Sequence, residues 1–217
     1  MIFTKIKCLL ITVMIVLAGM TVFGQSKKSA DDILKEVSEK TKSFASIRIN
    51  FTYNMDNPSA KVHESENGTL LVKGDMYRLN IAGQLVISDG ATVWTYISDV
   101  NEVQINEVED DESILTPNRL LTAYSKDYKA KLTGEVTKGG MVQYVMELKP
   151  QADKSFTSVE LNIDKELMRI ARIAIQDKNG NTFSYIVNKF DTNVPVKDSD
   201  FKFNTTDYPG VEVIDMR

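Results

Sequence analysis

Residues 47–55 read IRINFTYNM, and apolar and polar side chains alternate along the whole stretch. The apolar positions are Ile47, Ile49, Phe51, Tyr53 and Met55. Successive side chains of a β-strand point to opposite faces, so a period of two predicts a strand with one buried and one solvated face. This pattern favours a sheet protein whose sheet is apolar on one side.

Further strands are predicted on both sides of this stretch, each bounded by turn residues. Their predicted ranges are 60–73, 75–81, 84–88, 91–97, 102–108, 128–137, 141–149, 156–164, 168–177 and 181–190. Asp89-Gly90 is predicted as a two-residue hairpin turn, because glycine takes the positive φ that such turns require. A last turn and strand are expected at about residues 196–215.

Two helices interrupt the strands. The first begins at the capping-box-like pair Ser29 and Asp32. Its apolar stripe consists of Ile33, Leu34, Val37, Thr41 and Phe44. The second is short and begins at Thr116-Pro117, since Thr is a good N-cap and Pro is favoured at the first helical position. It carries Leu120, Leu121 and Tyr124.

These elements predict a mainly β (α+β) fold with ten or eleven antiparallel strands. Because no crossover helices separate the strands, a parallel sheet is excluded. Such a long sheet should curl, and the helices should cover one mouth or face of it. No break in composition suggests a linker, so residues 25–217 are expected to form one domain.

The first 24 residues have the pattern of a secretion signal. Lys5 and Lys7 precede an uncharged stretch from Cys8 to Phe23, and Gly24-Gln25 fits a cleavage site. The uncharged stretch is shorter than the ~20 residues that span a bilayer, which favours cleavage over anchoring. We therefore expect an exported protein.

The composition excludes several classes of function. The chain of 217 residues has 26 basic and 30 acidic residues and a formal net charge of −4, so it lacks the basic surface that nucleic acid requires. One Cys and one His cannot form a disulfide, a cysteine zinc cluster or a two-histidine metal site. No metal or other cofactor is expected.

The sequence shows no catalytic constellation. His63 lies among Lys61, Glu64 and Glu66, where an exposed, solvated imidazole is expected. The acidic run at residues 109–112 offers oxygen ligands for Ca²⁺, but a solvated loop is favoured because four adjacent acids cannot all reach one ion. A non-enzymatic role is predicted, and a hydrolase is the weakest alternative.

Aromatic side chains decorate the strands and the second helix. They include Tyr53, Tyr77, Trp94, Tyr96, Tyr124, Tyr128 and Tyr144. In a curled sheet covered by a helix, such residues line a cavity or fill an ordinary core, and the pattern leaves both interpretations open. Arg78 lies between Tyr77 and Leu79 and should face away from them if the strand is regular.

Three segments resemble the LolA-type periplasmic carriers of outer-membrane lipoproteins. Residues 85–96, LVISDGATVWTY, are similar to the family's D-G-x-x-x-W-x-Y hairpin. Residues 68–73, GTLLVK, and residues 208–215, YPGVEVID, resemble a strand and the C-terminal ending of the family. The resemblance covers essentially the whole of residues 25–217.

This resemblance implies an unclosed β-barrel with helices forming a lid over a hydrophobic cavity that receives acyl chains. It implies a cavity and lid built from Phe51, Tyr53, Leu70, Val72, Tyr77, Leu79, Trp94, Tyr96, Leu120, Leu121 and Tyr124. In the family an arginine that follows the lysine of the similar strand holds the lid closed, and here Gly74 follows Lys73. Arg78 is the candidate replacement for that lid latch.

The resemblance further implies a monomeric periplasmic carrier with acylated lipoproteins as its cargo. It implies an inner-membrane ABC-type releasing complex as the donor and an acceptor at the outer membrane. Two alternatives remain open for the same fold: a carrier of another amphiphile such as a glycolipid, and a sensor of lipoproteins in envelope stress.

Overall fold

The computed structural model describes residues 28–108, 128–152 and 154–217. Within these residues the chain forms one α-helix, two short 3-10 helices and the twelve strands of a single sheet. In chain order the elements are α1 (Ala30–Lys42), β1 (Ile47–Asn57), β2 (Val62–Lys73), β3 (Met76–Ile81), β4 (Gln84–Ser88), β5 (Thr92–Ile97), β6 (Glu102–Glu107), β7 (Tyr128–Lys138), β8 (Met141–Pro150), β9 (Phe156–Asp164), β10 (Arg169–Asp177), β11 (Thr182–Thr192), η1 (Asp198–Phe201), η2 (Thr205–Asp207) and β12 (Glu212–Asp215).

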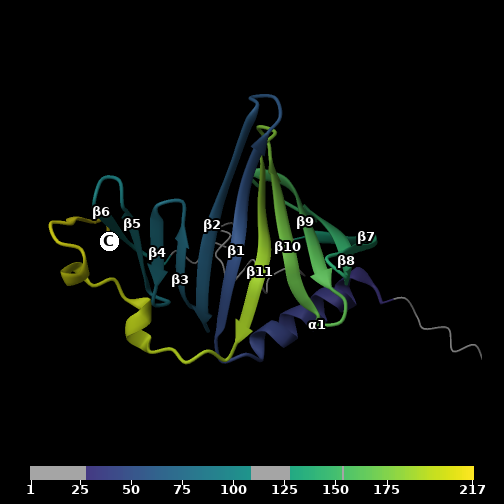
Figure 1. The fold of residues 1–217 in the computed structure, drawn as a ribbon, viewed down its shortest axis with the longest axis horizontal. Coiled ribbons are helices and arrows are strands. Elements are labelled where there is room, and N and C mark those ends of the chain that lie inside the picture. Colours follow the sequence, from purple (N-terminus) through teal and green to yellow (C-terminus); the bar gives the residue numbers. More distant parts are fainter. Residues whose placement is uncertain (1–27, 109–127, 153) are drawn as a thin grey trace, which may run out of the picture.

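The sheet is open. Its strands follow the order β12-β6-β5-β4-β3-β2-β1-β11-β10-β9-β8-β7, so in the described chain β7 and β12 are its two edges (Figure 1). The predicted unclosed antiparallel sheet is confirmed, and β1–β11 reach the upper end of the predicted number of strands. The sequence did not predict that β12 pairs parallel to β6, with Val213 beside Val103.

Two meanders meet at the pairing of β1 with β11. We call β2–β6 the first wing and β7–β10 the second wing. The long strand β1 pairs with β2 along its whole length and with β11 on its other side, so it joins the two wings. The segment after β11 runs back along the first wing to β12 (Figure 1).

Helix α1 lies across one face of the sheet, which we call the inner face. Ser29 accepts a hydrogen bond from the Asp32 amide, and Asp32 accepts one from the Ser29 amide, so the predicted capping box is present. Ile33, Leu34 and Val37 are buried in one apolar cluster with residues of both wings. The amphipathic stripe of the helix thus covers the apolar side of the sheet, as predicted.

One predicted turn lies a residue further along the chain. Ser88 pairs with Val93, and the Asp89 amide donates to the carbonyl of Thr92, so the two central residues of this turn are Gly90 and Ala91. Gly90 has φ +93°, as a first central glycine requires. Asp89 instead stabilises the turn, because its carboxylate accepts from the amides of Ala91 and Thr92.

Three predicted features lie outside the described residues. They are the signal at residues 1–24, the acidic run at 109–112 and the helix beginning at Thr116 with Leu120, Leu121 and Tyr124. In the part of the chain that the structure describes, no helix is both long and apolar enough to cross a membrane.

Candidate functional site

The inner face of β1, β2 and β3 carries a continuous apolar surface. The register places Phe51 opposite Gly68, Leu70 opposite Leu79, and Val72 opposite Tyr77. Paired residues of neighbouring strands share a face, so alternation brings part of the predicted site together. The predicted residues on this surface are Phe51, Tyr53, Leu70, Val72, Tyr77 and Leu79.

Four aromatic rings form the centre of this surface. Tyr185 lies 5.8 Å from Phe51 and 5.5 Å from Tyr53 between ring centroids, and Tyr53 stacks on Phe183 at 6.5 Å. Phe183 and Tyr185 of β11 were not among the residues predicted for the site. Their place follows from the pairing of β11 with β1, which puts Tyr185 opposite Tyr53 and Phe183 opposite Met55.

Gly68 leaves room for the Phe51 ring. A Cβ atom on Gly68 would lie 2.3 Å from Cζ of Phe51, far inside van der Waals contact. Phe51 is only 5% exposed, so its ring has little space to move away. The absence of a side chain at Gly68 therefore allows the ring to lie flat over β2 and extends the aromatic surface across two strands.

The inner face is closed at one end and half-open at the other. Beneath α1, Leu148, Leu161 and Ile163 are fully buried. Toward the first wing, Tyr53, Leu79, Ile81, Val86 and Tyr185 are only half-buried while still packing on the same cluster. Apolar area therefore remains on the part of the inner face that α1 leaves uncovered.

The aromatic and aliphatic residues of the half-open part are uncharged at neutral pH, and Glu64 and Glu66 of β2 border them, opposite Met55 and Tyr53. Burial raises the pKa of the Tyr77 phenol, and burial followed by the neighbouring Tyr53 raises the pKa of Tyr185. Both phenols therefore stay neutral well above physiological pH. The surface suits an apolar ligand, because a charged group placed there would lose its hydration.

The described residues show no cluster of metal ligands. Nowhere in residues 28–108, 128–152 and 154–217 do three His, Cys, Asp or Glu side chains gather as a metal site would require. His63 is exposed, and its Nδ1 lies 2.5 Å from Oδ1 of Asp56 at the end of the β1–β2 hairpin. The inner face is equipped to bind by burial.

Trp94 and Tyr96, which were predicted for the cavity, lie on the opposite, outer face of the first wing. The register pairs Trp94 with Ile87 and Tyr96 with Leu85, and Ile87 is in turn opposite Arg78. Tyr96 lies 4.5 Å from Tyr208 and 5.7 Å from Phe203 between ring centroids. These two residues therefore pack beneath the chain's own C-terminal segment.

Arg78 also faces outward, as alternation with Tyr77 predicted. Its Nη1 donates to the carbonyl oxygen of Asp200 in η1 at 3.4 Å, and the nearby Nζ of Lys73 bonds to Asp198 at 2.7 Å. The bond to Lys73 lowers the pKa of the Asp198 carboxyl. The contact that the structure describes for Arg78 is thus to the C-terminal segment, and the predicted lid at residues 116–125 lies outside the described chain.

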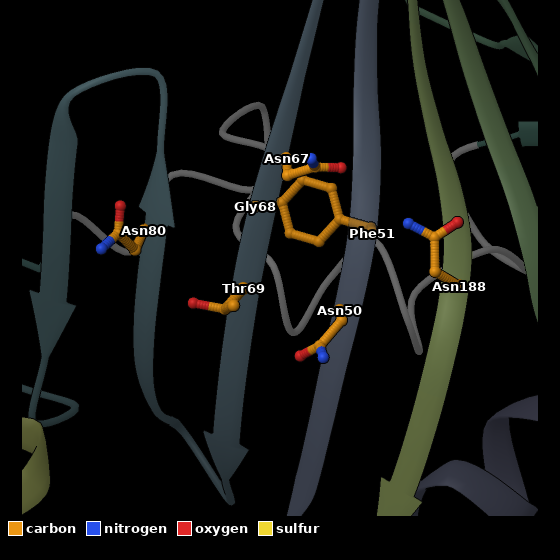
Figure 2. Close-up of a pocket in the computed structure, with 7 residues that line it drawn as sticks. All are labelled: Asn50, Phe51, Asn67, Gly68, Thr69, Asn80 and Asn188. Carbon is orange, nitrogen blue, oxygen red and sulfur yellow. The ribbon is translucent and has the colours of Figure 1, made fainter.

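A groove of about 460 Å³ lies where short β3 ends beside long β2. We call it the polar groove for its five polar side chains, which belong to the outer face, and Phe51 and Gly68 of the inner face also line it. Figure 2 shows its lining from β1, β2, β3 and β11: Asn50, Phe51, Asn67, Gly68, Thr69, Asn80 and Asn188. Asn188 donates to the Thr52 hydroxyl, which donates to the side-chain carbonyl of Asn67. This row of hydrogen bonds links three strands, and its outer surface offers amides and hydroxyls to a ligand.

Comparison with known proteins agrees with this fold. A model of the family described as "Outer membrane lipoprotein carrier protein LolA" matches residues 21–204. An outer-membrane lipoprotein carrier protein from Pasteurella multocida is 29% identical over 205 residues, which cover 92% of this chain and 95% of that protein. An uncharacterised conserved protein from Thermus thermophilus superposes with a TM-score of 0.58 at 15% identity, over 87% of this chain and 99% of that one.

Proposed function

Because the chain belongs to the LolA family of outer membrane lipoprotein carrier proteins, we propose that it carries lipoproteins by binding their acyl chains on the inner face of its sheet. The observation that carries this proposal is the half-open aromatic surface around Tyr53, Leu79 and Tyr185. It is apolar, bordered on β2 by Glu64 and Glu66, and incompletely covered by α1.

Burial of the acyl chains supplies the free energy for binding. Each CH₂ group removed from water stabilises the complex by about 0.8 kcal/mol. A lipoprotein with several chains cannot cross an aqueous compartment with them exposed. The inner face offers aromatic and aliphatic side chains over β1, β2, β3 and β11, which is the type of lining that such chains need.

The carrier can release its cargo only if the cargo-bound and the cargo-free states of the protein differ little in free energy. A carrier with a fully closed core would have to unfold locally before it could accept or release cargo. Half-buried residues such as Leu79 and Val86 avoid this cost, since part of their surface is already exposed. We include Leu120, Leu121 and Tyr124 in the proposal as lid residues on the ground of the family resemblance alone.

The proposed setting is the periplasm. We propose that residues 1–24 are a signal peptide cleaved near Gly24-Gln25, and that the remaining chain acts as a monomer. It would receive lipoproteins from an inner-membrane ABC-type releasing complex and deliver them to an outer-membrane acceptor. The family match supports the carrier role, and these two partners are part of the proposal.

Photo-crosslinking from adjacent residues tests the proposal. A photoreactive amino acid at Leu79 would lie on the inner face, and the same amino acid at Asn80 would lie on the outer face. We expect acylated lipoproteins to be captured in cells from position 79 and to be absent at position 80. Positions 79 and 80 are adjacent in the sequence, but their side chains lie on opposite faces of the sheet.

The products distinguish the alternatives. Capture of a glycolipid or free lipid from position 79 would keep the inner face as the binding surface and change the cargo. Equal capture from both positions, or from position 80 alone, would contradict binding on the inner face. A probe at Lys138, the exposed last residue of β7, reports non-specific capture.

A further inference from the structure

Strand β2 extends well past its neighbour β3. β3 pairs with β2 only from Thr69 to Lys73, whereas β2 begins at Val62. On its other side β2 stays paired with β1 along its full length. Within the described chain, residues 62–68 therefore form a regular strand with one partner and one open edge, which we call the β2 edge.

The open side of the β2 edge presents backbone hydrogen-bonding groups. Lys73 and Met76 flank a two-residue turn, so they form a hydrogen-bonded pair, and every second residue before Lys73 bonds toward β3. The same alternation directs the N–H and C=O groups of His63, Ser65 and Asn67 to the open side. Such groups are the template on which another extended chain can add.

The side chains of the β2 edge are exposed and differ between its two faces. Glu64 and Glu66 lie on the inner face, opposite Met55 and Tyr53 of β1. Glu66 lies directly opposite Tyr53, so the acidic edge adjoins the aromatic surface. Burial and, after it, the Glu64 carboxylate raise the pKa of the Tyr53 phenol. Two carboxylates spaced by two residues match cations at alternate positions of an added strand.

The polar groove lies at the base of the same edge. Asn80 ends the pairing of β3, and Asn67 and Thr69 continue along β2 on the outer face, as Figure 2 shows. A strand that extends the line of β3 beyond Ile81 would place its outer side chains over this groove. The groove's amides and hydroxyls suit polar side chains, so both faces of the added strand find complementary chemistry.

The other edges are less suited to strand addition. Edge strand β7 carries an irregularity in register between Leu132 and Gly134, and it bears Lys129, Lys131 and Lys138. Bulges and lysines are features that protect edges from pairing. Strand β12 spans only Glu212–Asp215.

A second copy of the chain is a poor occupant of the β2 edge. Antiparallel pairing of two such edges would bring Glu64 and Glu66 of one copy close to the same residues of the other. Like charges across a strand pair destabilise it. The charge of the edge therefore favours a cationic partner over self-association.

We propose that the β2 edge binds an extended cationic peptide segment, which adds as an antiparallel strand beyond the end of β3. Resting on the proposed carrier function, we assign this segment to the polypeptide part of the lipoprotein cargo. The acyl chains would lie on the aromatic surface beside Tyr53, and the peptide would leave along Glu66 and Glu64. The β2 edge then selects among cargoes by the charge of the peptide.

The test uses peptides without acyl chains. The probes are a soluble peptide of about ten residues with lysine at alternate positions and the same peptide with glutamate in their place. Hydrogen exchange of the full chain, followed by NMR, reports which amides the peptide protects. We expect the lysine peptide to slow exchange at His63, Ser65 and Asn67, and the glutamate peptide to leave these amides unchanged.

Two variants distinguish the contribution of the backbone amides to peptide binding from that of the charges. Ser65→Pro removes an amide that points to the open side and leaves the ladder to β1 intact, so it should abolish peptide binding in a folded protein. The Glu64→Lys/Glu66→Lys variant should weaken binding of the lysine peptide by about tenfold or more and gain binding of the glutamate peptide. Glu212→Lys on β12 is the matched control, and it should change neither.

The outcomes either support or overturn the proposal. Protection of alternate β2 amides together with the reversal of charge preference would support it. Protection on β7 or β12, peptide binding that survives Ser65→Pro, or protection that appears only with dimerisation of the chain would overturn it. Loss of acyl-chain capture from position 79 would contradict the carrier function without affecting this result, since the peptides carry no lipid.

Discussion

The two faces of the first wing are both apolar, yet they differ in how they are covered. On the outer face, Ile87 is 1% exposed and Phe201 is 0% exposed, because the C-terminal segment of the same chain lies over β3, β4 and β5. On the inner face of the same strands, Leu79 and Val86 remain half-buried. Both faces have similar residue types, so the difference in exposure comes from the segment that covers each face and not from the residues themselves.

This comparison separates a structural core from the proposed binding surface. A segment joined covalently to the sheet covers the outer face at a high effective concentration, so that face is closed in every folded molecule. The inner face of the first wing has no such cover from α1, which packs mainly toward the second wing. Apolar residues on the outer face therefore stabilise the fold, and those that α1 leaves half-buried on the inner face are the ones we propose for ligand binding.

The largest expected effect is on the outer face. Phe201→Ala removes a fully buried ring, and truncation of this kind costs about 3–5 kcal/mol of unfolding free energy. Urea denaturation measures the loss. Phe203→Ala on the same segment should cost clearly less, because Phe203 is half-buried. If Phe201→Ala lowered the free energy of unfolding no more than Phe203→Ala does, the outer face would not be a closed core.

The second effect concerns the close contact on the inner face. Gly68→Ala places a Cβ against the Phe51 ring and should lower the unfolding free energy by about 1–3 kcal/mol through overpacking. Adding Phe51→Leu should recover part of the loss. Gly134→Ala is the matched control, since a Cβ added at Gly134 would meet no atom of a non-adjacent residue within 4 Å and its φ is not positive. Equal costs at the two glycines would show that the ring contact is unimportant.

A smaller effect distinguishes binding from stability. Leu79→Ser on the inner face should weaken acyl-chain binding by about fivefold, as expected for about 1 kcal/mol of lost apolar contact at a half-buried side chain. Leu71→Ser on the outer face should lower stability and leave binding unchanged. Titration with a fluorescent fatty-acid probe and urea denaturation measure the two quantities. A binding defect in Leu71→Ser would argue against separate roles for the faces.

The smallest effect is a pH dependence at the end of the C-terminal segment. Arg217 donates to the Asp215 carboxylate from its side chain and its backbone, and these bonds lower the pKa of Asp215 to about 2. A lowered pKa stabilises the folded state above the ordinary value of 3.8, and this contribution is lost as the pH falls toward about 2. NMR titration should find the carboxyl pKa returning toward 3.8 in Arg217→Ala. An unchanged pKa would contradict the pairing.

Much of the fold follows from local patterns. The alternation at residues 47–55 and the capping box at Ser29 are short-range features, and each predicts an element that the structure contains. The turn predicted at Asp89-Gly90 is present but lies one residue further along the chain. The antiparallel order of neighbouring strands follows from short hairpins. Six residues that the family resemblance implied for the cavity lie on one face, because alternation within a strand fixes which side chains lie together.

Other site residues could not be placed by alternation within one strand. Strand β5 reads TVWTYI and lacks a clear polar face, so Trp94 and Tyr96 could belong to either side. The available signal was the register of two successive hairpins, which links Trp94 to Ile87 and Ile87 to Arg78. The contribution of Phe183 and Tyr185 required the pairing of β1 with β11, which joins residues far apart in the chain.

The sequence by itself determined the mainly β class, the antiparallel pairing of strands joined by short hairpins, the helix cap and the alternation of side chains, because these depend on neighbours within a few residues. The tertiary structure decided which apolar face is covered, where β12 pairs, and which part of β2 keeps an open edge. Each of these depends on segments that are distant in sequence, and their contacts arise only when the whole sheet has formed.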